Sequence, residues 1–172
     1  MDNEREQTRF IIQRFDNNIS GANTKGNFLL AFNTFLSGGI IANYDKLIKL
    51  IEKPDNYIYL NIVLILLFLV GLFTTGFIIN AVYPFLKSGN SSKDKYHSKI
   101  FFLSISEYDN EKIFANEYKK QDNEEVNEDL AKQVYILSKG LKSKYNSLAW
   151  AMRGIFIELG LMLVILILII CL

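Results

Sequence analysis

Hydrophobic and polar residues are segregated into long blocks along the chain. Residues 26–44, 57–82 and 154–172 are almost free of charge, and the charged residues crowd into the segments around them. A soluble domain interleaves the two classes, because each of its helices or strands has a buried face and an exposed face. Blocks of this length instead predict membrane-spanning helices joined by polar segments.

The second apolar block has the strongest membrane-spanning pattern. Residues 57–82 read YIYLNIVLILLFLVGLFTTGFIINAV, carry no charge, and would extend about 39 Å as a helix at 1.5 Å per residue. The hydrocarbon core of a bilayer is roughly 30 Å thick, so the block is long enough to cross it. Tyr57 and Tyr83 lie near its ends, where aromatic rings favour the membrane interface. The alternative is a buried helix of a soluble protein, which is rarely this long.

The other two blocks are shorter, and each contains a polar feature. Residues 154–172 are long enough to span a bilayer, and Glu158 is the one charged side chain among them. Residues 26–44 are diluted by Asn33, by other polar side chains and by glycines, which predicts a span whose polar side faces other helices. An amphipathic helix lying in the membrane interface is the alternative for this block. Asn33 and Glu158 are therefore the candidate polar positions within the membrane.

Basic residues predict the orientation of the spans. Four of them precede the first block, eleven lysines lie between Lys87 and Lys144, and only three lysines lie within residues 43–56. Since cytoplasmic segments carry the excess of basic residues, the N-terminus and the long middle segment are expected in the cytoplasm. The N-terminus has no pattern of a cleaved signal peptide.

These observations predict an all-α membrane protein with three transmembrane helices and a helical cytoplasmic segment between the second and third. The expected segments are a cytoplasmic amphipathic helix over 1–25, a span over 26–44, a short extracytoplasmic loop over 45–56, a span over 57–82, cytoplasmic helices over 83–153 and a span over 154–172.

An apolar stripe predicts a long helix ahead of the last block. Its members recur at spacings of three and four residues: Val126, Leu130, Val134, Leu137, Leu141, Tyr145, Leu148 and Met152. Because the stripe continues into residues 154–172, one helix of about 45 residues is expected to join the two segments. The stripe needs a covering surface, which favours a homo-oligomer over a monomer. Packing against the N-terminal helix is the alternative.

Composition excludes several functional classes. Basic and acidic residues nearly balance, at 19 and 18, so no overall field favours a nucleic acid polymer as a partner. Cys171 and His97 are the only residues of their types, and there is no glycine-rich phosphate loop, HExxH or GxSxG motif. The acidic run DNEEVNED lacks the spacing of an EF-hand and is expected to begin a helix. We therefore expect a non-enzymatic protein without a metal site.

Three short motifs mark the entries to the first and last spans and the start of the middle segment. Residues 22–33, ANTKGNFLLAFN, are similar to Ala-Asp-x-Lys-Ala/Gly followed by Leu-Leu-Ala-x-Asn, with Asn23 in the acidic position. Residues 99–106, KIFFLSIS, are similar to a Phe-Phe-x-x-Ile motif, with Ser104 where glycine is frequent. Residues 143–152, SKYNSLAWAM, are similar to Lys-Tyr-x-x-Leu-x-x-Ala. In this order, and with three spans, the motifs resemble the transmembrane effectors of bacterial Pycsar anti-phage systems over nearly the whole chain.

The resemblance implies a two-gene immune system of the bacterial inner membrane. A partner cyclase encoded nearby would sense infection and make cyclic UMP (cUMP) or cyclic CMP (cCMP). The effector would respond by impairing the integrity of the inner membrane, and the cell would die before the phage matures. This outcome is called abortive infection.

A cyclic pyrimidine mononucleotide presents one phosphate charge and one base, which proteins bind with cations and aromatic faces. On that chemistry the candidate ligand residues are Lys25, Lys95, Lys99, Phe102 and Tyr108. The alternative roles are core packing for the phenylalanine and solvated or membrane-flanking positions for the lysines.

Two other functions fit the same pattern of segments. A non-enzymatic membrane scaffold or subunit would recruit a protein partner through its cytoplasmic helix. A holin-like pore would need only the spans, so the sizeable cytoplasmic segment counts against it.

Overall fold

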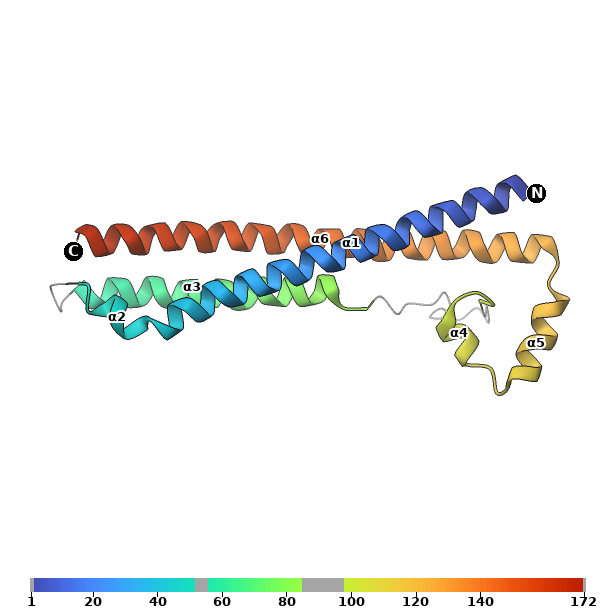
Figure 1. Ribbon diagram of the computed structural model, residues 1–172, viewed down its shortest axis with the longest axis horizontal. Coiled ribbons are helices and arrows are strands. Elements are labelled where there is room, and N and C mark those ends of the chain that lie inside the picture. The colour runs from blue at the N-terminus through green and yellow to red at the C-terminus, as the bar shows by residue number, and fades with distance from the viewer. Residues whose placement is uncertain (1, 52–55, 85–97, 172) are drawn as a thin grey trace. The chain divides into compact units, whose positions relative to one another are not determined.

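The computed structural model describes residues 2–51, 56–84 and 98–171, and within these ranges the protein is helical without β-strands (Figure 1). The all-α prediction is confirmed for this part of the chain. The helices are α1 (Asp2–Ala42), α2 (Tyr44–Ile48), α3 (Tyr57–Val82), α4 (Phe102–Ser106), α5 (Glu111–Lys120) and α6 (Asn123–Cys171).

Two of the described helices, α3 and α6, are long and apolar enough to cross a membrane. Helix α3 covers the uncharged block 57–82, and α6 runs without a break from the acidic run through the last apolar block. The third predicted span, over residues 26–44, falls within α1, which is not one of the two helices that meet these criteria. The short loop expected over residues 45–56 contains a five-residue helix, α2.

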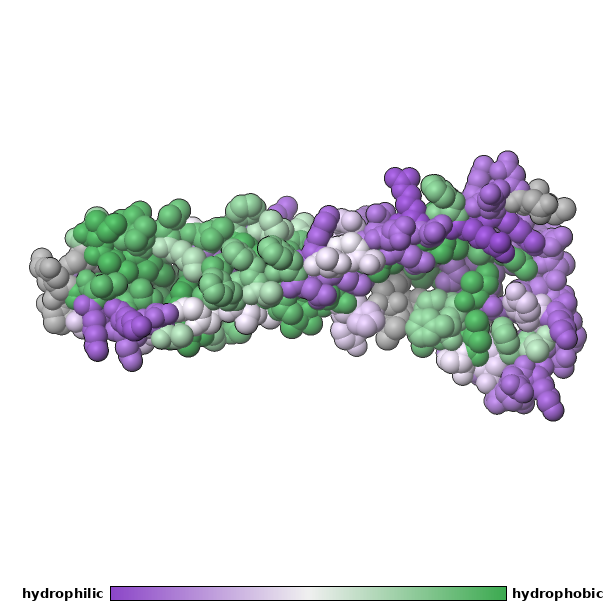
Figure 2. All heavy atoms as spheres, in the orientation of Figure 1, coloured by the Kyte–Doolittle hydropathy of each residue, from purple (hydrophilic) through white to green (hydrophobic). Residues whose placement is uncertain are grey.

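The chain forms two compact units, which are described separately. We call residues 1–21 and 84–143 the polar unit, and residues 22–83 and 144–172 the apolar unit. Figure 2 shows hydrophilic residues gathered on the polar unit, whereas hydrophobic residues cover α3 and the C-terminal part of α6. Large apolar side chains on α3, such as Phe73 at 72% exposure, lie on the outer surface of the unit. Exposed apolar surface of this extent is typical of helices that face lipid.

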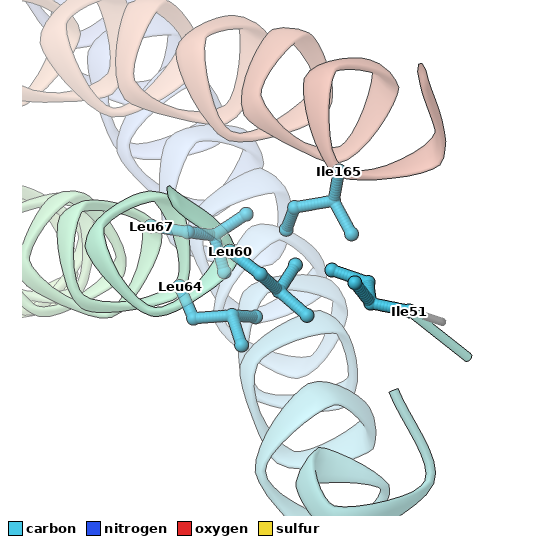
Figure 3. Close-up of a cluster of buried hydrophobic side chains, with 5 residues drawn as sticks. All are labelled: Ile51, Leu60, Leu64, Leu67 and Ile165. Carbon is cyan, nitrogen blue, oxygen red and sulfur yellow. The ribbon is translucent and has the colours of Figure 1, made fainter. Parts of the chain in front are cut away.

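The apolar unit packs parts of α1, α3 and α6 against one another along a seam of α3. The buried residues of this seam recur at alternating spacings of four and three: Leu60, Leu64, Leu67, Gly71, Thr74, Ile78 and Ala81. Near the start of α3, Leu60, Leu64 and Leu67 form a core with Ile51 and Ile165 (Figure 3). Near its end, a second core joins Ala81 with Ala22 of α1 and Leu148 of α6. Helices α1 and α6 therefore both pack against this seam of α3.

The polar unit contains α4, α5 and the N-terminal parts of α1 and α6. Helix α5 begins at a capping residue, Asn110, whose Oδ1 accepts from the backbone N–H groups of Lys112 and Ile113 at 3.0 Å each. Helix α6 begins after Asp122, whose Oδ1 accepts from the N–H groups of Glu124 and Glu125 at 2.9 and 2.8 Å. The expectation that the acidic run begins a helix is therefore confirmed.

Candidate functional site

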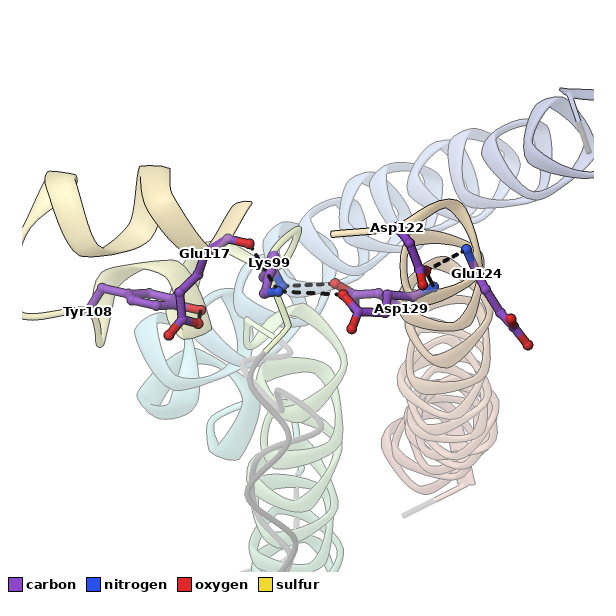
Figure 4. A network of polar contacts seen from close by, with 7 residues as sticks. Lys99, Tyr108, Glu117, Asp122, Glu124 and Asp129 are labelled. Carbon is purple, nitrogen blue, oxygen red and sulfur yellow. Dashed lines mark hydrogen bonds and ion pairs between the residues drawn. The ribbon is translucent and has the colours of Figure 1, made fainter. Parts of the chain in front are cut away.

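The buried carboxylate of Asp129, on α6, binds residues 98 and 99, which lie just before α4. The Ser98 hydroxyl donates to Asp129 Oδ1 at 2.8 Å. The Lys99 backbone N–H donates to Asp129 Oδ2, also at 2.8 Å (Figure 4). The Ser98 oxygen in turn accepts from the N–H groups of Ile100 and Phe101 at 3.2 and 3.0 Å. These bonds order the chain immediately before α4, because backbone donors there have no helical partner.

Two of the predicted ligand residues, Lys99 and Tyr108, meet at Glu117 of α5. Lys99 Nζ donates to the Glu117 carbonyl oxygen at 3.3 Å and lies 3.9 Å from Glu125 Oε2. The Tyr108 hydroxyl donates to Glu117 Oε2 at 3.3 Å, and burial, followed by the Glu117 charge, raises the pKa of Tyr108. A phosphate placed here would meet the carboxylates of Glu117 and Glu125, so this arrangement is poorly suited to an anion.

Of the other three predicted ligand residues, the structure describes Phe102 and Lys25. Phe102 is 60% exposed and its ring packs 5.0 Å from that of Phe101, measured between centroids. Lys25 belongs to the apolar unit, where its Nζ lies 6.0 Å from the centroid of the Tyr145 ring. Lys95 lies outside the described residues.

The polar unit contains a pocket of about 390 Å³ between α1, the end of α5 and the start of α6. Its apolar lining includes Ile12, Ile100, Val126 and Leu130. Its polar lining is Arg9, Gln13, Asp16, Tyr118 and Gln121. Pockets that bind small molecules have volumes of roughly 300–1,000 Å³ and combine apolar walls with a few polar groups.

The polar residues that line the pocket come from one face of α1 and from the end of α5. Arg9, Gln13 and Asp16 are spaced by four and three residues, so they share a helix face, and Arg9 and Asp16 are about 10 Å apart along the axis. Tyr118 and Gln121, at the end of α5, face the same space. The pocket therefore offers one guanidinium, one aromatic ring, two amides and one carboxylate.

This pocket was not predicted from the sequence. Arg9 and Tyr118 are more than a hundred positions apart, and neither belongs to a recognisable motif. The available signal was the helical spacing of the polar residues 9, 13 and 16 next to the apolar residues Ile11, Phe15 and Ile19.

The apolar unit contains a buried lysine that binds three helices together. Lys144 is 4% exposed, and its Nζ donates to Asn23 Oδ1 at 2.9 Å, to the Ala81 carbonyl at 2.7 Å and to the Tyr83 carbonyl at 2.9 Å. The last carbonyl groups of a helix have no partner within it, so the ammonium group supplies one at the end of α3. Burial lowers the pKa of Lys144, which lies outside the apolar block 154–172.

The two polar positions predicted within the membrane both lie between helices of the apolar unit. Asn33 is 1% exposed, and its Nδ2 donates to the Gly71 carbonyl at 3.0 Å and to Thr75 Oγ1 at 2.9 Å. Glu158 is also 1% exposed, and its side chain lies beside Thr74. Both residues thus face α3.

The family comparison covers both units. The model of the Pycsar effector protein domain matches residues 7–172, nearly the whole chain. The chain belongs to the Pycsar effector family. Membership implies a role in anti-phage defence together with a partner cyclase and a cyclic nucleotide signal. With the two long apolar helices, it indicates a membrane protein. No match was found among curated proteins or among solved structures.

The resemblance inferred from the three motifs is confirmed by this match. Two positions depart from the motifs. Asn23 stands where the Pycsar effector motif has an acidic residue, and it still supplies an oxygen acceptor to Lys144. Ser104 stands where glycine is frequent, and it is fully buried. In this Pycsar effector the first and third motifs therefore meet through the contact between residues 23 and 144.

Proposed function

We propose that this Pycsar effector binds a cyclic pyrimidine mononucleotide, cUMP or cCMP, in the pocket of the polar unit and responds by impairing the inner membrane. The family supports a cyclic nucleotide as the signal. The observation that carries the assignment to this pocket is the presence of Arg9 and Tyr118 around a space of about 390 Å³.

Each polar group of the pocket has a counterpart on such a ligand. The Arg9 guanidinium can bind the cyclic phosphate with two parallel hydrogen bonds, which matches its single negative charge. The Tyr118 ring offers a stacking face to the base. The amides of Gln13 and Gln121 carry both a donor and an acceptor, as recognition of a pyrimidine edge requires, and Asp16 can accept from the ribose hydroxyl.

Calorimetry on the purified protein in detergent tests the ligand and its site together. The wild type is expected to bind cUMP or cCMP, and Arg9→Gln is expected to weaken binding at least about tenfold, since a hydrogen bond to a charged group contributes roughly 1.5–3 kcal/mol. Arg14→Gln removes an exposed charge from the same helix and is the matched control, with unchanged affinity expected.

A third variant separates this pocket from the contacts at Glu117. Lys99→Gln is expected to leave the affinity unchanged, because Lys99 already contacts Glu117 and Glu125. Loss of binding in Lys99→Gln with normal binding in Arg9→Gln would place the ligand at Glu117 instead.

The proposed membrane arrangement has three spans, with the N-terminus and residues 83–153 in the cytoplasm. The contacts of Asn33 with α3 support a membrane position for residues 26–44, since lipid offers an amide no partner. In the same proposal the effector is a homo-oligomer and has no enzymatic activity. Family membership favours this effector role over a scaffold or a holin-like pore.

The single cysteine, Cys171, tests the proposed orientation. In spheroplasts a membrane-impermeant thiol reagent is expected to label Cys171 from outside. A Cys171→Ser variant carrying Lys112→Cys, an exposed position of α5, is expected to react only after lysis. The opposite pattern would reverse the assigned orientation.

A further inference from the structure

The apolar unit contains a layer of polar residues between its three helices, partway along α3. Its members Asn33, Thr74 and Glu158 are buried. Helix α1 contributes Asn33, α3 contributes Thr74 and Thr75, and α6 contributes Glu158. Asn33 Nδ2 donates to the Gly71 carbonyl and to Thr75, and the Glu158 side chain lies beside Thr74. Residues 71, 74 and 75 lie within about one turn of α3, so these contacts occupy the same level of the helix. We call this set the polar layer.

Two oxygens in the polar layer lack a hydrogen-bond partner among the described residues. They are Asn33 Oδ1 and Glu158 Oε1, and both are buried. A buried acceptor without a partner is unfavourable, and hydrocarbon chains offer no donor. A water molecule could donate a hydrogen bond to these oxygens, and a cation could bind to them directly.

The helices approach closely at this level, and the approach places further oxygens beside the layer. The Ser37 hydroxyl oxygen lies 2.8 Å from the position that a Cβ atom on Gly71 would occupy. The hydroxyl of Thr74 lies directly against Gly154 of α6. Hydroxyl, amide and carboxyl oxygens therefore lie along the α3 seam at this level.

The only ionisable side chain of the polar layer is acidic. Glu158 is the only charged side chain in the three apolar blocks, residues 26–44, 57–82 and 154–172. No lysine, arginine or histidine occurs in them to stabilise an anion. Rings of acidic side chains and oxygen dipoles select cations in membrane pores, and an ionisable residue inside a membrane commonly marks an ion path.

We propose that the polar layer is the cation-selective constriction of the path through which the activated protein permeabilises the membrane. The species bound there is a monovalent cation with its water, coordinated by Asn33 Oδ1 and the Glu158 carboxyl group. This inference rests on the membrane half of the proposed function and adds the location and charge selectivity of the leak.

The test is the reversal potential of planar bilayers containing the purified protein, under a potassium chloride gradient, with cUMP and cCMP each added as activator. The wild type is expected to conduct potassium over chloride by roughly tenfold or more, as pores with acidic constrictions do. Glu158→Gln keeps the size of the side chain and an oxygen acceptor but removes the ionisable group, so its permeability ratio is expected to fall close to one. Glu128→Gln, an exposed position on the same helix, is the matched control and keeps the wild-type ratio.

The possible results separate this inference from the proposed function. A nucleotide-dependent leak that passes both ions equally in the wild type, or equal selectivity in wild type and Glu158→Gln, overturns the inference and leaves the proposed function standing. Absence of conductance with either nucleotide overturns the membrane half of the proposed function and this inference with it. The permeability ratio of potassium to chloride in the wild type tests the inference even if Glu158→Gln fails to fold.

Discussion

Gly154→Leu is expected to unfold the apolar unit at a markedly lower temperature than the wild type. A Cβ atom at this position would meet the hydroxyl of Thr74 and lie 3.1 and 3.3 Å from its Cβ and Cγ2 atoms. A threonine side chain is short, and the Thr74 hydroxyl also donates to the Val70 carbonyl at 2.8 Å, so it has little room to move away. The helices α3 and α6 would have to separate.

Overpacking of this kind destabilises proteins by about 1–3 kcal/mol, and a full leucine side chain is at the upper end of that range. Gly160→Leu is the matched control, because no atom other than those of its chain neighbours and its own helix backbone lies within 4 Å of a Cβ built there. Thermal unfolding followed by circular dichroism in one detergent compares the two variants. Equal unfolding temperatures for Gly154→Leu and Gly160→Leu would contradict the packing of α6 on α3 described above.

Lys144→Met is expected to destabilise the protein by about 1–3 kcal/mol, the cost of leaving buried hydrogen-bond acceptors without their donor. Methionine fills similar space but donates no hydrogen bond. Asn23 Oδ1 and the carbonyl groups of Ala81 and Tyr83 would then lose the donor that Lys144 supplies. Three helices would lose their shared contact at once.

Lys142→Met is the control for this prediction, since Lys142 is exposed on the same helix two residues away. Unfolding by heat or denaturant in matched detergent is the measurement, and the control is expected to remain within about 0.5 kcal/mol of the wild type. Similar losses in both variants would mean that a change from charged to apolar side chain, and not the buried contact, causes the effect.

The helices were largely predictable because their patterns are local. The uncharged block 57–82 has the bounds of α3, and the stripe from Val126 to Met152 continues through one helix, α6. The start of α6 followed from the acidic run, because Asp122 caps it. By contrast, residues 26–44 could not be separated from the segment before them, since α1 is continuous from Asp2 to Ala42 and its polar residues are spread along it.

The candidate sites depended on contacts between distant parts of the chain. Lys99 and Tyr108 were chosen for the chemistry of a nucleotide site, but the helix α5 brings Glu117 against both of them. The proposed role of Arg9 in phosphate binding depends on the packing that places α1 and Tyr118 around one pocket. Lys144 belonged to a recognised motif, yet its partners at residues 23, 81 and 83 follow from helix packing, which no local pattern reveals.

The central claim is that a cyclic pyrimidine nucleotide turns this membrane protein into one that permeabilises the bilayer. The most direct test is potassium release from liposomes containing the purified protein, with cUMP, cCMP or cyclic AMP added. We expect release with cUMP or cCMP, little with cyclic AMP, and none from liposomes containing Arg9→Gln at the same nucleotide concentration. Release that is equal with and without nucleotide, or no release with either pyrimidine nucleotide although one binds, would contradict the account.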